Sequence, residues 1–270
     1  MKTLNLFCNR SLLTGKMGYI KNIISAAVVT FVIIYATRDG AYETYEQTRS
    51  VLFSVMIGSL MLGFFNSITL FHSKKHFIMD DLKKDLPVGT YVLDTMLNEA
   101  FLCIAQAVAV TVVFFAFLEY PSKGIVFNAN LDYLVTFFLT AYSADCLGMF
   151  LGLNNSSIGS CMVIVPVTVI IQMLLSGCLF DLNADILEKV SRFTTAFYSF
   201  SCLGSIADLN SEKLPYALQL AYTEIQKTPN NLFDPSATYV TWCWFRLGIL
   251  SVVLILMTYL LLTLKLYRKY

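Results

Sequence analysis

The chain has 270 residues, of which 57% are hydrophobic and 14% charged, and its formal net charge at pH 7 is +1. Soluble domains are usually about 45–50% apolar and about a quarter charged, so this composition predicts a protein with several membrane spans. The near-neutral charge argues against nucleic-acid binding, which needs a basic face. The seven cysteines are scattered without a CxxC pair, which indicates packing residues instead of a metal site or a disulfide framework.

Residues 1–21 carry four basic side chains among apolar ones. This pattern predicts an amphipathic helix that lies on the cytoplasmic face of the membrane and leads into the first span. It fits equally well a charged leader that only fixes the orientation of that span. Residues 22–37 form the first long apolar run, and they predict a short first span that is extended by its flanks.

The second predicted span, residues 51–72, carries a stripe of small side chains. Ser59, Gly63 and Ser67 follow one another at intervals of four residues, so they share one face of a helix. Such a stripe lets the backbone of another helix come close.

Residues 73–99 form the longest charged interruption between the first long apolar segments, with four lysines and five acidic residues. Four apolar side chains in it have helix-like spacing: Phe77, Ile78, Leu82 and Leu86. This spacing predicts a short amphipathic helix outside the membrane, and the early acids and late lysines suit its dipole. Pro87 and Gly89 end that helix before the next apolar run begins.

Four further apolar runs complete a predicted set of six spans: 96–118, 133–153, 158–179 and 242–266. Each run is close to the roughly 20 residues that a bilayer requires. Six spans place both termini on one side of the membrane. Three short tracts hold 11 of the 19 lysines and arginines: 1–21, 73–99 and 265–270. Because basic residues beside span ends favour the cytoplasm, we expect these tracts and both termini there.

Polar residues inside the predicted spans are candidates for function. Asp145 is the one acidic residue deep in a span, where a carboxylate is costly and faces protein or water. Two interpretations stay open: Asp145 lines a pathway, or it hydrogen-bonds a neighbour from the small-residue face formed by Ala144, Gly148 and Gly152. Three amides also lie in the spans, where interhelical hydrogen bonding explains them at least as well as substrate contact: Asn66, Gln106 and Gln172.

A family resemblance rests on two segments. The first, SKKHFIMDDLKKDLPVGTYVLDTML from Ser73, is similar to the cytoplasmic coupling region of the membrane domain of ABC exporters, specifically the G (white/brown) subfamily. The matching positions are Lys74, Lys75, Phe77, Asp80, Tyr91 and Leu93. Lys84 stands where the family usually has a glycine. The second segment, 141–182, resembles the fourth and fifth spans of the family through its AYSA run and its Ser176-Gly177 pair.

The resemblance implies an all-α membrane protein with one transmembrane domain over 1–270. Its expected parts are a connecting helix at 1–21, a cytoplasmic coupling loop at 73–95, and an extracytoplasmic segment with re-entrant helices at 180–241. It implies a type-2 permease of the plasma membrane or the bacterial inner membrane that exports a hydrophobic or amphipathic substrate by alternating access. The permease would pair with a second membrane domain as a homodimer or heterodimer.

The motor and the site residues follow from the same resemblance. The chain has no phosphate-cradling loop and no GxGxxG, so ATP and Mg²⁺ are expected on a separate ATPase domain or subunit, with no cofactor in this chain. The residues expected to contact that ATPase are Phe77, Asp80, Asp81, Leu82 and Lys83. For the substrate pathway the resemblance suggests Phe53, Met56, Phe64, Met162 and Met173. Asp145 is added to this set because of its depth in a span, and not because of the resemblance.

Two other classes of function stay open. Asp94 and Asp145 are the two acids that a membrane-embedded aspartyl hydrolase would need, because one acid must stay protonated while the other is ionised. Asp94, however, lies at the mouth of a different span, and neither acid sits in a recognised protease motif. The third class is a channel or structural protein without catalysis.

Overall fold

The structure is a computed structural model, and it describes residues 2–37, 41–42, 45–82, 87–118, 124–155, 157–179, 185–210 and 232–267. For residues 2–19, 69, 72–77, 79–82, 158 and 185 it describes the backbone alone. Every regular element in these ranges is an α-helix, as the sequence predicted. The helices are α1 (Lys2–Thr37), α2 (Tyr45–Leu82), α3 (Val88–Phe117), α4 (Ala129–Asn154), α5 (Ile158–Leu174), α6 (Asp185–Ser191), α7 (Thr195–Ile206) and α9 (Ala237–Tyr267).

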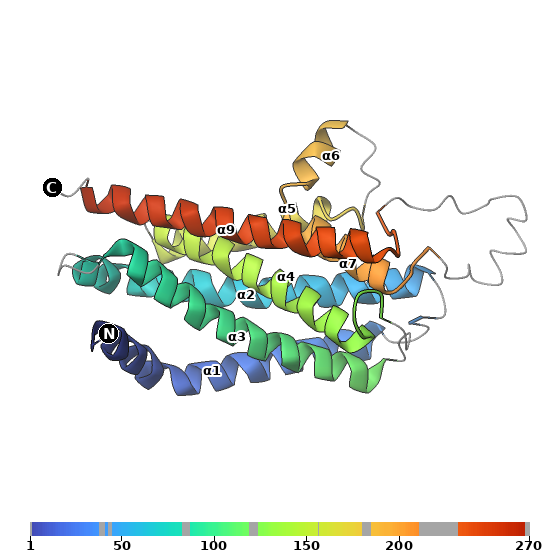
Figure 1. Cartoon of the computed structure of the whole chain (residues 1–270), viewed down its shortest axis with the longest axis horizontal. Helices are drawn as coiled ribbons and strands as arrows, with labels where there is room; N and C mark the ends of the chain where they lie inside the picture. Colours follow the sequence, from blue (N-terminus) through green and yellow to red (C-terminus); the bar gives the residue numbers. More distant parts are fainter. Residues whose placement is uncertain are drawn as a thin grey trace, which may run out of the picture.

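The long helices lie side by side in one bundle (Figure 1). Five described segments are long and apolar enough to cross a membrane: Ile20–Thr37, Tyr45–Ile68, Val88–Phe117, Ala129–Asn154 and Ala237–Tyr267. A helix pairs all of its backbone polar groups internally, which a lipid environment requires. The start of α1 and the end of α9 lie at the same end of the bundle (Figure 1).

The fifth predicted span is shorter than expected. We predicted residues 158–179, whereas α5 has 17 residues and ends at Leu174, which corresponds to about 26 Å. The chain then turns, and Gly177 has a φ of 78°, in the left-handed region that favours glycine and ends helices. Pro166 lies inside α5 without ending it.

Two predicted short helices are continuous with the neighbouring spans. The expected connecting helix at 1–21 is the first part of α1, and Figure 1 shows it at an angle to the rest of that helix. The expected coupling helix begins as a direct continuation of α2, which runs unbroken through 38 residues to Leu82. No proline or glycine occurs between residues 64 and 82 to break it. Pro87 stands at the N-cap of α3, and Gly89, which we expected before the next helical run, lies in its first turn.

The tightest packing in the bundle is between α2 and α4. A Cβ built on Gly63 of α2 would lie 2.3 Å from the carbonyl oxygen of Ala141 in α4. Gly148 and Gly152 of α4 meet backbone oxygens of α2 in the same way, each at 2.7 Å from a built Cβ. The two predicted small-residue faces therefore pack against each other, backbone to backbone.

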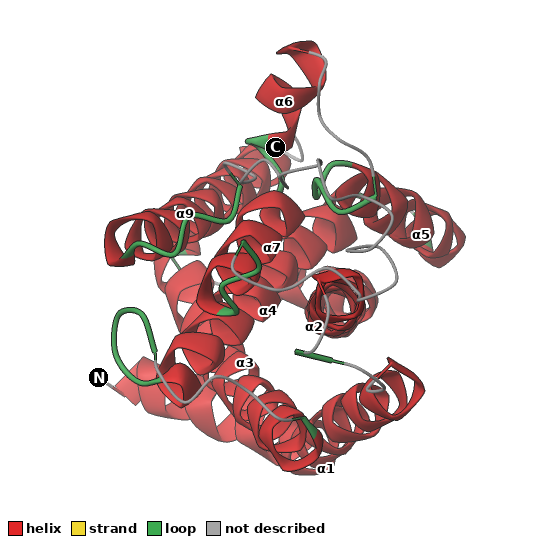
Figure 2. Cartoon of the chain, turned by 90° about the vertical axis from the view of Figure 1, so that its right-hand side faces the viewer, coloured by secondary structure: helices red, strands yellow, loops and turns green. Residues whose placement is uncertain are grey.

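The segment before the last span contains a buried helix. All twelve residues of α7 are buried, and α7 packs against α2, α4, α5 and α9 (Figure 2). Two polar contacts join α7 to other helices: Thr140 Oγ1 of α4 donates to Ser199 Oγ at 2.8 Å, and the Ala196 backbone amide donates to Gln172 Oε1 of α5 at 3.0 Å. This part of the predicted segment 180–241 thus lies inside the bundle, while residues 211–231 are outside the described ranges.

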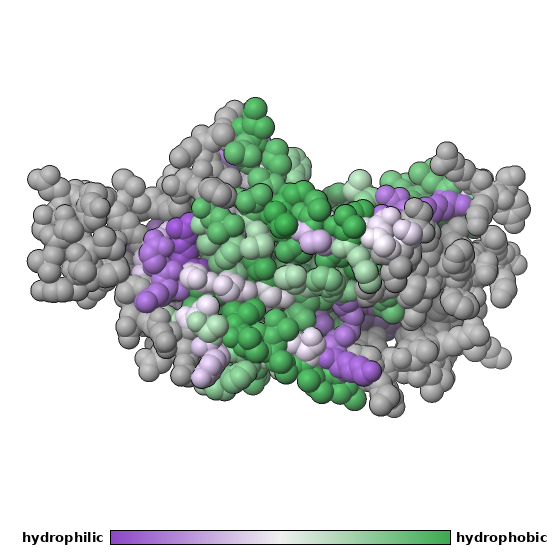
Figure 3. All heavy atoms as spheres, turned by 180° about the vertical axis from the view of Figure 1, so that it is seen from behind, coloured by the Kyte–Doolittle hydropathy of each residue, from purple (hydrophilic) through white to green (hydrophobic). Residues whose placement is uncertain are grey.

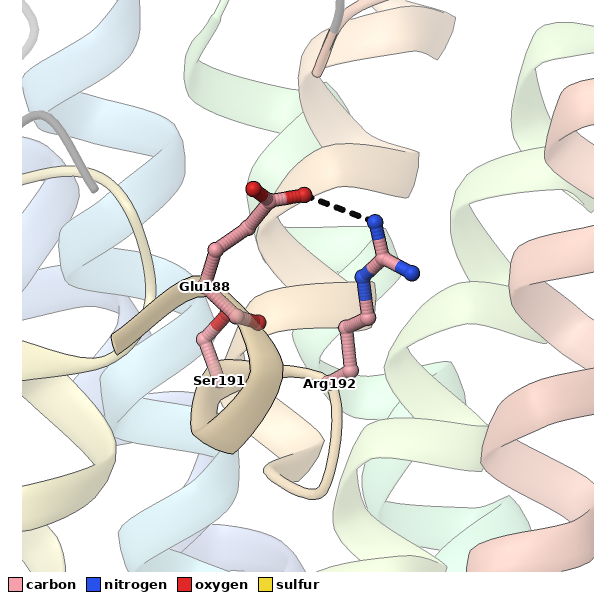
Figure 4. A network of polar contacts seen from close by, with 3 residues as sticks. All are labelled: Glu188, Ser191 and Arg192. Carbon is pink, nitrogen blue, oxygen red and sulfur yellow. Dashed lines mark hydrogen bonds and ion pairs between the residues drawn. The ribbon is translucent and has the colours of Figure 1, made fainter. Parts of the chain in front are cut away.

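The short helix α6 projects from the bundle (Figures 1 and 2). On its polar side Arg192 Nη2 donates to Glu188 Oε1 at 2.7 Å, and Ser191 Oγ donates to the Glu188 carbonyl at 2.8 Å (Figure 4). An exposed ion pair of this kind contributes little to stability. Ile186 of α6 and Phe193, which follows the helix, are exposed.

Apolar side chains cover much of the described surface seen from behind (Figure 3). Large hydrophobic residues are exposed on several helices, for example Phe101 and Val112 on α3 and Leu264 on α9. Lipid tails would cover such a surface in a membrane protein.

Candidate functional site

A cavity of about 640 Å³ lies between α1 and α2. Four residues of α1 and eight of α2 line it, together with Gln106 from α3 and Met173 from α5. No charged residue is among the described residues of its wall. Most of the wall is apolar, formed by side chains such as Val29, Ile33 and Phe53.

The helical repeat explains which residues reach the cavity. Asn22, Ser25, Val29 and Ile33 recur every three to four residues, so they form one face of α1. The lining residues of α2 recur in the same way from Phe53 to Asn66. Gly58 brings the two helices together beside the cavity, because a Cβ built on it would lie 2.8 Å from Ile33 Cδ1.

The cavity has a polar end made of amide side chains. Asn22 Nδ2 of α1 donates a hydrogen bond of 2.5 Å to Asn66 Oδ1 of α2. Gln106 of α3, only 2% exposed, belongs to the same wall, and its Oε1 accepts no hydrogen bond from the described residues. The cavity therefore joins a long apolar wall to a small group of neutral donors and acceptors.

Asp145 lies outside this cavity, fully buried in α4. Ser67 Oγ of α2 donates a hydrogen bond to its Oδ1, and its Oδ2 has no partner among the described residues. Glu99 of α3 acts on Asp145 electrostatically. The hydrogen bond from Ser67 is a helix-to-helix contact of the kind that the packing interpretation names. The acid that acts on Asp145 is Glu99, whereas the hydrolase interpretation named Asp94.

Comparison with known families identifies the bundle. Residues 1–206 match the family model of the ABC-2 type transporter, which is more than half of the chain. The chain belongs to the ABC-2 type transporter family. With its apolar helices, it is an integral multi-pass membrane protein and the transmembrane permease of an ABC transporter. A comparison with curated proteins finds no match.

The permease brings two of its six predicted pathway residues together at the cavity. Phe53 and Met173 line it, from α2 and α5. Met56 and Phe64 are buried on the side of α2 that faces the core of the bundle. Met162 is 65% exposed on the outer face of α5.

Sequence reasoning did not single out Asn22 or Gly58 of the permease wall. Asn22 is the third residue of the first apolar span and Asn66 the third from the end of the second. Consecutive antiparallel spans bring the start of the first next to the end of the second, so an asparagine at each of these positions could have predicted that the two side chains pair. Gly58 follows Ser54 by four residues, on a second face of small residues in α2.

The predicted coupling residues of the permease lie at the end of α2. Phe77, Asp80, Asp81 and Leu82 are in its last turns, where the structure describes the backbone only, and Lys83 is outside the described residues. These turns lie at the end of the bundle that also holds the start of α1 and the end of α9 (Figure 1).

Proposed function

We propose that this permease exports a hydrophobic or amphipathic substrate and that the cavity between α1 and α2 is part of its pathway. The observation that carries the proposal is the composition of the wall, which is mainly apolar and uncharged at membrane depth. A volume of about 640 Å³ is in the range of small-molecule sites, about 300–1,000 Å³. An apolar substrate could enter such a site without the cost of burying a charge.

The energy for export would come from a partner. ABC-2 membrane domains work with ATPase partners, and we propose that ATP and Mg²⁺ bind a separate ATPase domain or subunit. The end of α2, with Phe77, Asp80, Asp81, Leu82 and the following Lys83, would contact that ATPase, as in the G subfamily that this segment resembles.

The continuous course of α2 supports this mechanism. Leu82 and the cavity residue Asn66 belong to one unbroken helix, so they are about 24 Å apart along its axis. A push on the end of α2 would reach the cavity wall as a rigid-body displacement. Two such membrane domains, working as a homodimer or heterodimer, would then open the pathway alternately to either side.

We further propose that both termini and residues 73–95 face the cytoplasm of a plasma membrane or bacterial inner membrane. The start of α1, the end of α2 and the end of α9 lie at one end of the bundle (Figure 1). The short tracts rich in lysine and arginine are at that same end of the predicted topology, and such tracts favour the cytoplasm.

Reconstitution in liposomes with the candidate ATPase tests the coupling. A variant with Phe77→Ala, Asp80→Ala and Leu82→Ala is expected to lose most of the ATP turnover that the permease elicits. A control with Leu97→Ala and Phe101→Ala, two exposed apolar positions on α3 beyond the predicted coupling loop, should keep it. Unchanged turnover with an intact complex in the coupling variant would refute the assignment.

A further inference from the structure

We propose that Gln106 selects substrates that carry a hydroxyl group, so that the permease prefers neutral alcohols with a long apolar tail. This inference rests on the proposed function, because it names the substrate class of the same cavity. Its basis is a buried amide on the cavity wall whose oxygen has no hydrogen-bond donor among the described residues.

The cavity has the two-ended form that an amphiphile requires. Phe53 and Asn66 both line it and are separated by 13 positions in α2, or about 20 Å along the helix axis. The amides Asn22, Asn66 and Gln106 contribute most of the polar groups, with the small hydroxyls of Ser25 and Ser54, whereas side chains such as Ile33 and Met173 form apolar wall. A molecule with a long apolar tail and one small polar head matches this distribution.

The chemistry of the polar end favours a neutral head. A charged head would meet no opposite charge among the described lining residues, and burying it would be costly. A buried carbonyl oxygen without a donor also carries a desolvation penalty, which a ligand O–H would relieve. The Gln106 oxygen is itself buried. Because the terminal torsion of a glutamine is broad and roughly two-fold, a rotation that exchanges the amide oxygen and nitrogen would present the oxygen to the cavity.

A hydroxyl suits this site better than an ether. It can donate to the Gln106 oxygen and can also accept from an amide N–H, whereas an ether oxygen can only accept. Asn22 and Asn66 already share one hydrogen bond of 2.5 Å, so the acceptor that Gln106 offers is the distinguishing feature. The permease should therefore separate two ligands that differ in a single O–H.

The test uses two probes, a photoreactive hexadecanol and its methyl ether, with the purified permease in lipid nanodiscs. Saturable photolabelling is measured, and the labelled peptides are assigned by mass spectrometry. In the unmodified permease we expect labels on α1 and α2 and an affinity about two- to tenfold higher for the alcohol, the range of one hydrogen bond. The variant Gln106→Met, similar in shape but without an acceptor, should bring the alcohol down to the affinity of the ether.

The control Phe53→Leu, at the apolar wall, should weaken both probes equally. Equal affinity for alcohol and ether in the unmodified permease would overturn the inference, whatever the variant does. So would an equal loss of both probes in Gln106→Met, or the absence of label from α1 and α2. Absence of label from α1 and α2 would also count against the cavity as the pathway, whereas equal affinity for the two probes would leave that proposal standing. The ATP-turnover test is independent of both results.

Discussion

No side chain fits between Gly63 of α2 and the carbonyl oxygen of Ala141 in α4, since a Cβ on the glycine would lie 2.3 Å from that oxygen. Gly63→Ala must therefore push the two helix backbones apart. We expect a loss of about 1–3 kcal/mol in stability, typical of overpacking, measured by thermal unfolding of the purified protein in detergent. The control is Gly248→Ala in α9, where a built Cβ meets nothing within 4 Å. Equal stability of the two variants would contradict the close contact.

The buried hydrogen bond from Ser67 to Asp145 gives a second prediction. Ser67→Ala removes the described donor to Asp145 Oδ1 and leaves that oxygen buried. We expect a cost of about 1–3 kcal/mol, the penalty of an unsatisfied buried group. Ser59→Ala is the matched control, because Ser59 Oγ donates to the Val55 carbonyl of its own helix at 3.0 Å. If thermal unfolding shows the two alanine variants to be alike, the hydrogen bond contributes nothing.

Two methionines of α5 provide a third prediction. Met173 lines the cavity, whereas Met162 is 65% exposed on the outer face. Met173→Ala removes apolar contact worth about 0.8 kcal/mol for each buried methylene, so the affinity for the photoreactive alcohol should fall about fourfold or more. Met162→Ala should leave that affinity unchanged. A larger effect at Met162 would place the binding site outside the cavity.

Membrane topology is the subject of the fourth prediction. Lys83→Cys and Lys123→Cys are introduced singly into a cysteine-free variant and treated with a membrane-impermeant maleimide. With six crossings, Lys83→Cys should react only after the membrane is opened, and Lys123→Cys should react in intact cells. Reaction of both before opening would show that the bundle crosses differently. Reaction of Lys83→Cys alone would place the coupling segment outside the cell and refute the proposed contact with an ATPase.

The apolar runs of the sequence predicted the long helices because length and hydropathy are local properties. Their boundaries were less accurate where polar residues enter the helix. We predicted that the third span starts at residue 96, whereas α3 starts at Val88, because Asp94 and Asn98 made its first turns look like a loop. The end of α5 was placed too late, because the apolar run continues past the turn at Gly177.

The buried position of α7 and the cavity depend on contacts between distant parts of the chain. The hydroxyls of α7 lie inside the bundle: Ser199 Oγ accepts from Thr140 of α4, and Ser205 Oγ donates to the Ser201 carbonyl of its own helix at 2.9 Å. The amide pair joins residues 22 and 66, which no periodicity relates. The small-residue faces of α2 and α4 were predicted because their four-residue spacing is visible in the sequence.

The backbone contact between α2 and α4 limits how the cavity can change shape. At Gly63, Gly148 and Gly152 the two helix backbones are too close to slide past each other, so we expect α2 and α4 to move as one rigid unit. The α2 side of the cavity is then held in place by α4, and the width of the cavity depends on how far α1 and α5 lie from α2. A ligand that binds tightly between α1 and α2 should therefore block the proposed transport cycle without contacting the ATPase.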